Sequence, residues 1–489
     1  MTVLDDPSSA PLVGFGLADP LLRELDLEIE QIDGALPREL SGTLYRIGPG
    51  KLQVGATMLD NILDGDGMVS RFTLDGGRAH FRNRYVRTPQ FRHGQRSSRI
   101  VHRGLGTMRP GGRLANLLRM PTNVANTGVV RHGGELLALW ELGRPHRLDL
   151  DTLETLGTED FGGTLKWIGA FSAHPKTDPR TGEMFNFGLD LLPRPQIRCY
   201  RTDRAGRTRQ VARVPLLDLP WNHDMALTDT HLVFVLDPIL PDIRKLVLSS
   251  CSYLEALSYR PRRGTRFLLV PRAGGRPRIV EHEALLHFHL GNAFDDGGDV
   301  VVDLVHFGPD WHRVTRALGH IREHETLPDS RLMRYRITPG GRVVEQELLA
   351  VPSEFPQLDP RRTGRSNRFG YLAGRVEGPH YDAIMKIDNG SGRSTAHRMP
   401  GHSFGEALFV PRSGDTAEDD GWLLAMAIDQ RERRTKLVVL DARDLEREPM
   451  AVLHLPFTVP LGFHGLFTRR VAATAGRGAA ASVSEAGGG

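Results

Sequence analysis

Four histidines stand in separate, turn-bounded segments of this 489-residue chain, and they are its most informative side chains. They are His174 in AHPKTDPRTGE, His223 in NHDMALT, His289 in FHLGNA and His464 in GFHG. They are too widely spaced in the chain to share a helix face, so only a fold that brings distant segments together could unite them. Four neutral imidazoles without a thiolate or carboxylate would suit a borderline metal such as iron(II), copper or zinc. The alternative is that they are four unrelated members of a set of 20 histidines.

Nine short motifs, four of which contain these histidines, follow one another along the chain. They are GTLYRIGPG (42–50), DGDGMV (64–69), NVANTGVVRHGGELLALWE (123–141), AHPKTDPRTGE (173–183), NHDMALT (222–228), FHLGNA (288–293), EFP (354–356), GEALFVPR (405–412) and GFHG (462–465). Together they resemble the carotenoid cleavage oxygenase family, which includes apocarotenoid and stilbene oxygenases and the retinal-pigment-epithelium 65-kDa proteins. One such string would be weak support, but nine in sequence order are specific.

The resemblance implies a seven-bladed β-propeller that holds iron(II) on its axis. It implies that the four metal ligands are His174, His223, His289 and His464. It also implies that three ligand rings each donate their second N–H to a glutamate, which fixes tautomer and orientation. The pairs would be Glu141 with His223, Glu354 with His289 and Glu406 with His464, while His174 would lack a glutamate. Each glutamate is flanked by large apolar residues, an expensive place for a carboxylate without a partner.

The same resemblance assigns residues around the metal. Thr127 would occlude the sixth coordination position with its methyl group, which leaves one position for dioxygen. Four aromatic side chains would line an apolar substrate tunnel, and they are Trp140, Trp221, Phe288 and Phe307. Two of these lie within two residues of a predicted ligand in the sequence.

The implied reaction is oxidative scission of a carbon–carbon double bond, with dioxygen as co-substrate and two carbonyl products. Stilbene-cleaving relatives carry a lysine where this chain has Trp140, so a carotenoid or apocarotenoid is favoured over a phenolic stilbene. A stilbene-cleaving oxygenase remains the alternative within the family. Two hypotheses from other classes also remain: a propeller module that only binds an apolar isoprenoid, and a zinc hydrolase. In the hydrolase, four histidines would leave no evident general base beside the water.

Composition and charge argue against several other classes. The formal net charge is +4, and the arginines that supply most of the positive charge are scattered instead of forming a stripe with aromatics. No nucleic-acid partner is therefore expected. Cys199 and Cys251 form no paired pattern, which favours a reduced, cytoplasmic setting. The N-terminus shows no basic stretch followed by an apolar core, and no apolar run approaches the ~18–20 residues of a membrane-spanning helix.

The elements that position these residues are predicted to be β-strands. Gly/Asp turns in DGGRAHF, RHGGELLALW, DDGGDVVVDLVHF and EDDGWLLAMAID lead into alternating or apolar runs, which is typical of hairpins. Long helical periodicity is scarce, so the fold class is all-β: a propeller, a barrel or stacked sandwiches. A propeller would direct one strand of every blade to a common axis. We expect an N-terminal extension over 1–20, a single catalytic propeller over 21–470 and a disordered tail over 471–489.

Two segments, 112–120 and 241–257, interrupt the strand pattern with apolar residues at helical spacing. One interpretation is a helical or loop cap packed over one face of the propeller. The other is an apolar tunnel mouth that contacts a membrane surface peripherally to take up lipid-like substrate. In that case the basic flanks would meet lipid headgroups, and these are Arg113, Arg119, Arg244 and Lys245. The sequence leaves the oligomeric state open.

Overall fold

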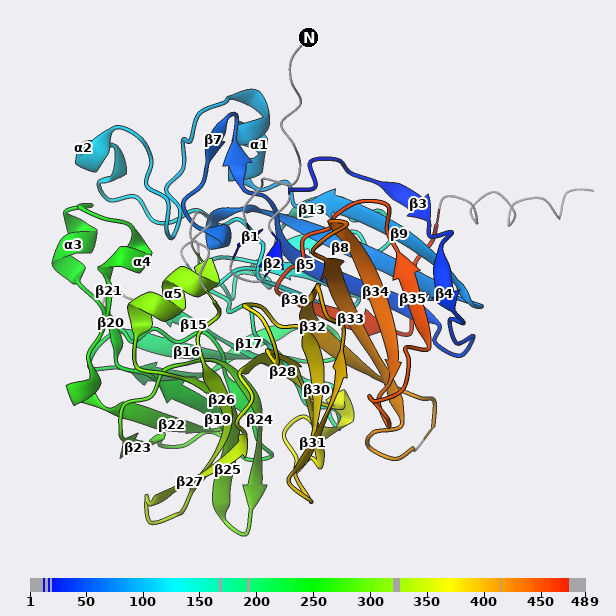
Figure 1. The fold of residues 1–489 in the computed structure, drawn as a ribbon. Coiled ribbons are helices and arrows are strands. Elements are labelled where there is room, and N and C mark those ends of the chain that lie inside the picture. Colours follow the sequence, from blue (N-terminus) through cyan, green and yellow to red (C-terminus); the bar gives the residue numbers. More distant parts are fainter. Residues whose placement is uncertain are drawn as a thin grey trace, which may run out of the picture.

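The protein folds as a ring of antiparallel sheets. The computed structural model describes residues 12–13, 16–17, 20–166, 169–190, 194–319, 326–414 and 416–474. Seven sheets of four or five strands are arranged around a common axis, and Figure 1 shows them fanning out from it. The predicted seven-bladed β-propeller is therefore confirmed.

Strands from both ends of the chain close the ring. Blade 1 contains β3 (Asp26–Glu28), β9 (Arg78–Tyr85), β8 (Asp66–Asp75), β5 (Gly42–Lys51) and, on its inner edge, the C-terminal strand β36 (His464–Thr468). Blade 7 contains β32 (His402–Pro411), β33 (Gly421–Asp429), β34 (Arg434–Asp441), β35 (Ala451–His454) and, on its outer edge, the N-terminal strand β4 (Ile32–Gly34). Because the early strand β4 completes the last blade and the last strand completes the first, backbone hydrogen bonds close the ring.

The other five blades have four strands each. Blade 2 contains β10 (Gly128–His132), β11 (Glu135–Leu139), β12 (His146–Leu148) and β13 (Thr155–Thr158). Blade 3 contains β14 (Lys176–Thr177), β15 (Met184–Asp190), β16 (Gln196–Thr202) and β17 (Thr208–Pro215). Blade 4 contains β18 (Ala226–Leu227), β19 (His231–Leu236), β22 (Thr265–Pro271) and β23 (Arg278–His282). Blade 5 contains β24 (His287–Asp296), β25 (Asp299–Phe307), β26 (Ser330–Ile337) and β27 (Val343–Leu349). Blade 6 contains β28 (Ser353–Gln357), β29 (Phe369–Gly374), β30 (Ala383–Asp388) and β31 (Arg393–Arg398).

Local sequence explains these strands. In blade 5, Asp296 pairs with Asp299, and the two-residue loop between them is Gly297–Gly298 with φ of +58° and +95°. That mirror-image turn matches the twist of a hairpin, as the DDGG motif predicts. The middle strands of the blades are buried on both faces because each blade is packed between two others, as the nearly unbroken burial of β33 shows. This explains why GWLLAMAID is almost entirely apolar.

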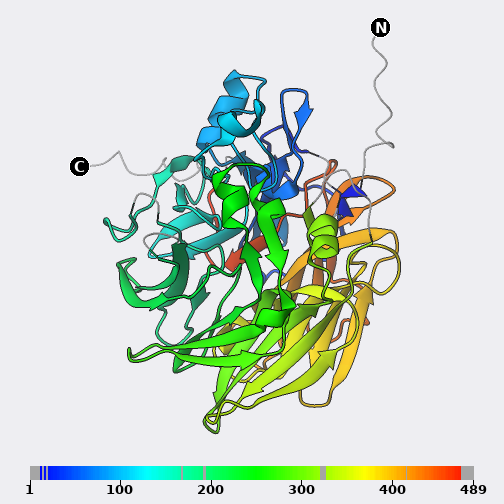
Figure 2. The same cartoon turned by 90° about the vertical axis from the view of Figure 1, so that its left-hand side faces the viewer.

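The innermost strands of neighbouring blades meet around the axis. β18 contacts β24, β24 contacts β28, β28 contacts β32, β32 contacts β36, and β36 contacts β10. Residues at the ends of these inner strands therefore come from distant parts of the sequence to one place. Figure 2 shows the same ring from the side that carries the green segments of the middle of the chain.

Short helices and ribbons cap one side of the ring (Figure 1). The helices are α1 (Pro89–Arg96), α2 (Gly112–Asn116), α3 (Ile243–Val247), α4 (Tyr253–Ala256) and α5 (Trp311–Gly319). The ribbons pair β6 (Gln53–Val54) with β7 (Thr57–Met58) and β20 (Ile239–Pro241) with β21 (Leu257–Tyr259). Both predicted interruptions, 112–120 and 241–257, contain such helices. In the described part of the chain, no helix has the length and apolar character needed to cross a bilayer.

The predicted terminal regions are described only in part. In the N-terminal extension, β1 (Leu12–Val13) and β2 (Gly16–Leu17) form a two-stranded ribbon. At the other end, 471–474 pack on blade 1, where Ala472 donates its N–H to Thr43 Oγ1 at 3.0 Å. Residues 475–489 lie outside the described residues, so the disordered tail and its boundary stay predictions.

Candidate metal centre

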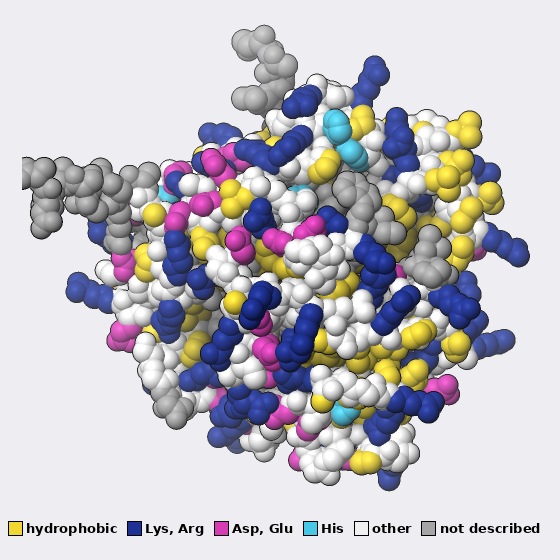
Figure 3. Space-filling view, turned by 180° about the vertical axis from the view of Figure 1, so that it is seen from behind, with side chains coloured by type: hydrophobic (Ala, Val, Ile, Leu, Met, Phe, Trp, Pro, Cys, Tyr) yellow, Lys and Arg dark blue, Asp and Glu magenta, His cyan; other side chains and the backbone are white. Residues whose placement is uncertain are grey.

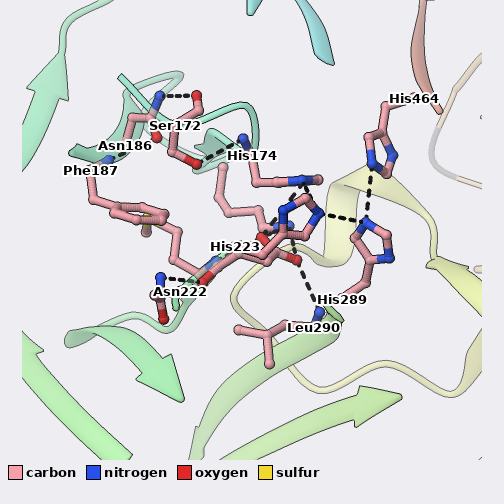
Figure 4. Close-up of polar contacts among 12 residues, drawn as sticks. Ser172, His174, Asn186, Phe187, Asn222, His223, His289, Leu290 and His464 are labelled. Atoms are coloured by element: carbon pink, nitrogen blue, oxygen red, sulfur yellow. Dashed lines mark hydrogen bonds and ion pairs between the residues drawn. The ribbon is translucent and has the colours of Figure 1, made fainter. Parts of the chain in front are cut away.

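The four histidines meet at the inner ends of the blades. His289 lies in β24 and His464 begins β36, whereas His174 and His223 stand just before β14 and β18. Their Nε2 atoms are separated by 2.9 Å between His174 and His223, 3.2 Å between His223 and His289, and 3.1 Å between His289 and His464 (Figure 4). One nitrogen of each ring lies within 4.8 Å of the others, so all four are placed to bind one metal ion.

The chemistry of this donor set fits a cation. A neutral imidazole that holds its proton on Nδ1 keeps a lone pair on Nε2. Four such lone pairs facing one another repel unless a positive charge lies among them. Burial and the three neighbouring imidazoles hold the pKa of His174 well below its usual value. Burial also lowers the pKa of His464, although Glu406 opposes it. Both rings are thus favoured in the neutral form that metals bind.

Two glutamates on inner strands accept hydrogen bonds from candidate ligand rings in an adjacent blade. Glu354 in β28 accepts from His289 Nδ1 at 2.6 Å, and Glu406 in β32 accepts from His464 Nδ1 at 3.0 Å. Each carboxylate is 2% exposed. These contacts place the proton on Nδ1 and turn Nε2 toward the axis. They are the pairings that the sequence resemblance implies.

The remaining two rings differ from each other. Glu141, which follows β11, lies with Oε1 2.9 Å from His223 Nδ1. Burial lowers the pKa of His223, but Glu141, together with Asp224 and Glu354, outweighs burial and raises it, so these carboxylates favour positive charge at the ring. His174 has no glutamate partner among the described residues. Its Nδ1 lies 4.0 Å from Asp224 Oδ1.

Glu406 is part of a larger buried network. The guanidinium of Arg46 contacts Glu406 Oε2 and also donates to the carbonyl of Phe463 at 3.2 Å. Gln357 Nε2 donates to Glu406 Oε1 at 2.8 Å. Burial raises the pKa of Glu406, but Arg46 and His464 outweigh burial and hold it below its usual value. Sequence reasoning missed Arg46, although it lies within the GTLYRIGPG motif.

An apolar cavity extends from the histidines toward the cap. The ligands that line it are His223, His289 and His464, and side chains of the cap such as Leu105, Leu254 and Trp311 form its far side. Among the predicted wall residues, Trp140, Trp221 and Phe288 line the cavity. The cavity is thus bounded by three of the candidate metal ligands on one side and by apolar cap residues on the other.

Thr127 and Phe307, both predicted from the resemblance, differ in their relation to the cavity. Thr127 lines the cavity, is 5% exposed and donates its hydroxyl to Asn126 Oδ1 at 3.0 Å. Phe307 was expected in the wall, but it is not among the described side chains that line the cavity. It is 1% exposed and packs edge-on behind Phe288 with ring centroids 5.8 Å apart. Phe307 therefore contacts a residue that lines the cavity, and a direct part in the wall stays a prediction.

Three aromatic wall residues were missed from the sequence. Phe355 and Phe463 follow or precede a predicted site residue directly, in EFP and GFHG, so the motifs contained a signal for both. Phe355 has a φ of +57°, a left-handed conformation that costs of order 1–3 kcal/mol for a non-glycine residue. Its ring lies 5.5 Å from that of His289. Trp311 of the cap stacks on Phe288 at 6.1 Å, and no sequence motif indicated it.

Known proteins match this chain in both sequence and fold. The model of the retinal pigment epithelial membrane protein family matches residues 18–469. Apocarotenoid-15,15'-oxygenase of Synechocystis is 32% identical over 458 residues, which cover 91% of this chain and 93% of that protein. Resveratrol cleavage oxygenase 1 of Aspergillus fumigatus is 31% identical and covers 92% and 94%. The structure of cobalt-substituted Synechocystis ACO has a TM-score of 0.86 at 32% identity and covers 93% of this chain and 97% of that chain.

The family match therefore spans all seven blades, the four histidines and the three glutamates. Both relatives are oxygenases, and they match this chain over nearly their whole lengths. This chain belongs to the retinal pigment epithelial membrane protein family, and it is an oxygenase.

Proposed function

We propose that this oxygenase uses iron(II) and dioxygen to cleave one carbon–carbon double bond of a carotenoid or apocarotenoid into two carbonyl products. The observation that carries the proposal is the convergence of four imidazole Nε2 atoms beside an apolar cavity. Four neutral nitrogen donors suit a borderline divalent metal. A zinc hydrolase is less well supported, because the three glutamates are engaged with ligand rings and Arg46.

The residues of the candidate metal centre would have different roles. His174, His223, His289 and His464 would hold the iron, and the three glutamates would fix the rings of the last three. When bound, iron would supply the one-electron chemistry that dioxygen needs to react with a double bond. Thr127, which lines the same cavity as three of the histidines, would occlude one side of the metal site with its methyl group and so limit where dioxygen enters.

The aromatic walls would hold a flat conjugated chain against the metal. The indole of Trp221 lies parallel to the ring of His223 at 10° with centroids 6.5 Å apart, and Phe288 meets the same ring edge-on at 5.8 Å. Both walls therefore rest directly on a metal ligand. A polyene that slides between them would place one double bond beside the metal, and the depth of the cavity would select which one. The same packing would exclude bulk water from the reaction.

The charge of the cavity supports a polyene over a hydroxystilbene. Trp140, at the position where stilbene-cleaving relatives carry a lysine, is 2% exposed and lines the wall. Among the described residues that line the cavity there is no lysine or arginine. A phenolate would thus be buried without a cationic partner, which is costly. Hydroxystilbene cleavage remains the second candidate, because a relative of similar identity is named for resveratrol.

We also propose that this enzyme is cytoplasmic and takes up its substrate through peripheral contact with a membrane. The apolar rim of the cap consists of exposed side chains on and after α2 and α3: Leu114, Leu117, Leu118, Met120, Ile243, Val247 and Leu248. No residue of α3 is buried, and its apolar residues Ile243 and Val247 are exposed. Ser249 ties the two segments together by donating to Asn116 O at 3.0 Å. Figure 3 shows apolar side chains gathered at the upper right, with basic side chains around them.

A substrate panel tests the proposed reaction. Iron-loaded enzyme is incubated with carotenoids, apocarotenals and hydroxystilbenes, and products are identified by mass while dioxygen uptake is recorded. We expect a polyene to yield two carbonyl products with matching dioxygen consumption. Cleavage of a hydroxystilbene alone would refute the proposed polyene substrate but would still support oxidative cleavage of a double bond. Polyene binding without dioxygen uptake would favour a binding module instead of an enzyme.

The variant Trp140→Lys sharpens the same test. A lysine in the wall would offer a phenolate the cation that it lacks, so the ratio of hydroxystilbene to polyene turnover should rise by about tenfold or more, the equivalent of one charge-assisted contact. Trp140→Phe is the matched control, because it keeps an apolar ring and adds no charge. An unchanged ratio in the lysine variant would show that Trp140 only packs the wall.

A further inference from the structure

The segments that carry the ligands have little support from the blades. His174 and His223 stand before β14 and β18, which have only two residues each. Within β24 the pairing with β25 shifts register on both sides of Leu290, the residue after His289. A regular ladder of hydrogen bonds therefore does not fix the backbone at three of the four ligands. Some other contact must set the spacing of these segments.

One buried carboxylate reaches all three segments. Asp224 directly follows the ligand His223 and is 1% exposed. Its Oδ2 accepts the backbone N–H of Leu290 at 2.9 Å, a hydrogen bond drawn in Figure 4. Its Oδ1 lies 3.0 Å from the ammonium of Lys176, two residues after another ligand. It also accepts the N–H of Met225 at 2.7 Å, which fixes its own rotamer.

We propose that the Asp224–Lys176 ion pair is a positioning device that sets the spacing of the segments carrying His174, His223 and His289. This inference rests on the metal centre proposed above. Asp224 supplies the hydrogen bond that the irregular strand β24 lacks, and Lys176 ties the loop of His174 to the same carboxylate. The distance of 4.0 Å from Asp224 Oδ1 to His174 Nδ1 exceeds a direct hydrogen bond, so the pair acts on this ligand through the backbone and not through its ring.

The rings of His223, His289 and His464 each have a glutamate at Nδ1. For His174, which has none among the described residues, the Asp224–Lys176 pair holds the segment where no glutamate holds the ring. Replacing Lys176 would leave Asp224 charged and buried without its partner, which is strongly unfavourable, whereas the Lys176 side chain is 24% exposed. Replacing both would remove the uncompensated charge but not restore the lost spacing.

Metal binding by the metal-free protein tests this inference. The variants are Asp224→Asn, Lys176→Met and the double variant, and Co²⁺ is titrated against a chelator while its visible bands are recorded. The matched control is Lys386→Met, which breaks a second Lys–Asp pair, with Lys386 Nζ 2.8 Å from Asp419 Oδ2 in blades 6 and 7, where neither residue belongs to a ligand segment. We expect each single variant to bind Co²⁺ about 10–100-fold more weakly with shifted bands.

The control should bind within about twofold of the parent. The double variant should lose less than the sum of the two single losses, because the two groups act as a pair. A purely structural pair would lower the melting temperature and leave the Co²⁺ bands unchanged, and that result would overturn the inference. If a single variant does not fold, the Asp224→Asn, Lys176→Met double variant carries the test, because neither charge then remains without its partner. Failure of the parent itself to bind Co²⁺ or Fe²⁺ would instead refute the metal centre.

Discussion

The candidate metal centre and the apolar rim of the cap are built by opposite means. At the centre, polar side chains are buried and held by partners on neighbouring blades, as Glu354 and Glu406 are. At the rim, apolar side chains are exposed on short helices, and Leu114 and Leu118 are 87% and 85% exposed. The difference shows that groups which must keep a fixed geometry lie on or beside the inner strands, whereas groups that meet a variable partner lie on short cap elements.

The largest effect should come from breaking the network of the centre at its most connected glutamate. Glu406→Gln leaves the guanidinium of Arg46 buried without its counter-charge, whereas Glu141→Gln leaves no such cation. We expect both variants to weaken iron binding about 10–100-fold. Glu406→Gln should in addition lose about 3–5 kcal/mol of stability. Chelator competition and urea unfolding measure the two effects separately.

Equal stability of these two glutamine variants would contradict the role of the Arg46 contact. Restoration of stability in an Arg46→Met, Glu406→Gln double variant would support it, because neither buried charge then remains. Iron affinity should stay low in that double variant, since His464 would still lack a carboxylate.

A smaller effect is expected at the rim. The double variant Val247→Glu, Leu248→Glu places two charges on α3, so flotation with liposomes should fall several-fold, while turnover of detergent-dispersed substrate stays at the parent level. The matched control is Ile279→Glu, Val344→Glu, on outer strands of blades 4 and 5, where the parent side chains are 50% and 41% exposed. Equal flotation of parent, variant and control would show that the rim does not contact membranes.

Local chemistry predicted the hairpins, because a turn such as Gly297–Gly298 depends only on residues next to it. The blade number and the four ligands came from the motif resemblance, since no repeat is visible along the chain. The missed residues share a physical cause. Asp224 lies inside the NHDMALT motif, yet its role depends on Lys176 and Leu290, which are distant in sequence.

Layers of aromatic residues were also hard to predict. Phe307 and Phe288 are both apolar residues of blade 5, and only tertiary packing decides which one reaches the cavity and which one stands behind it. Trp311 lines the cavity from the cap helix α5, and no local sequence pattern predicts where that helix lies. The sequence therefore indicated the side chains of the candidate metal centre better than the aromatic residues that face them across the cavity.

The central claim is that the four histidines bind one iron ion, and metal content tests it most directly. The parent, His289→Ala and His454→Ala are purified without added metal and analysed for iron, zinc and copper. His454 is the matched control because it pairs with Asp33 at the outer edge of blade 7, away from the axis. The account predicts about one iron per chain in the parent and the control, and none in His289→Ala together with loss of turnover. Zinc in place of iron in the parent, or full iron content and turnover in His289→Ala, would contradict it.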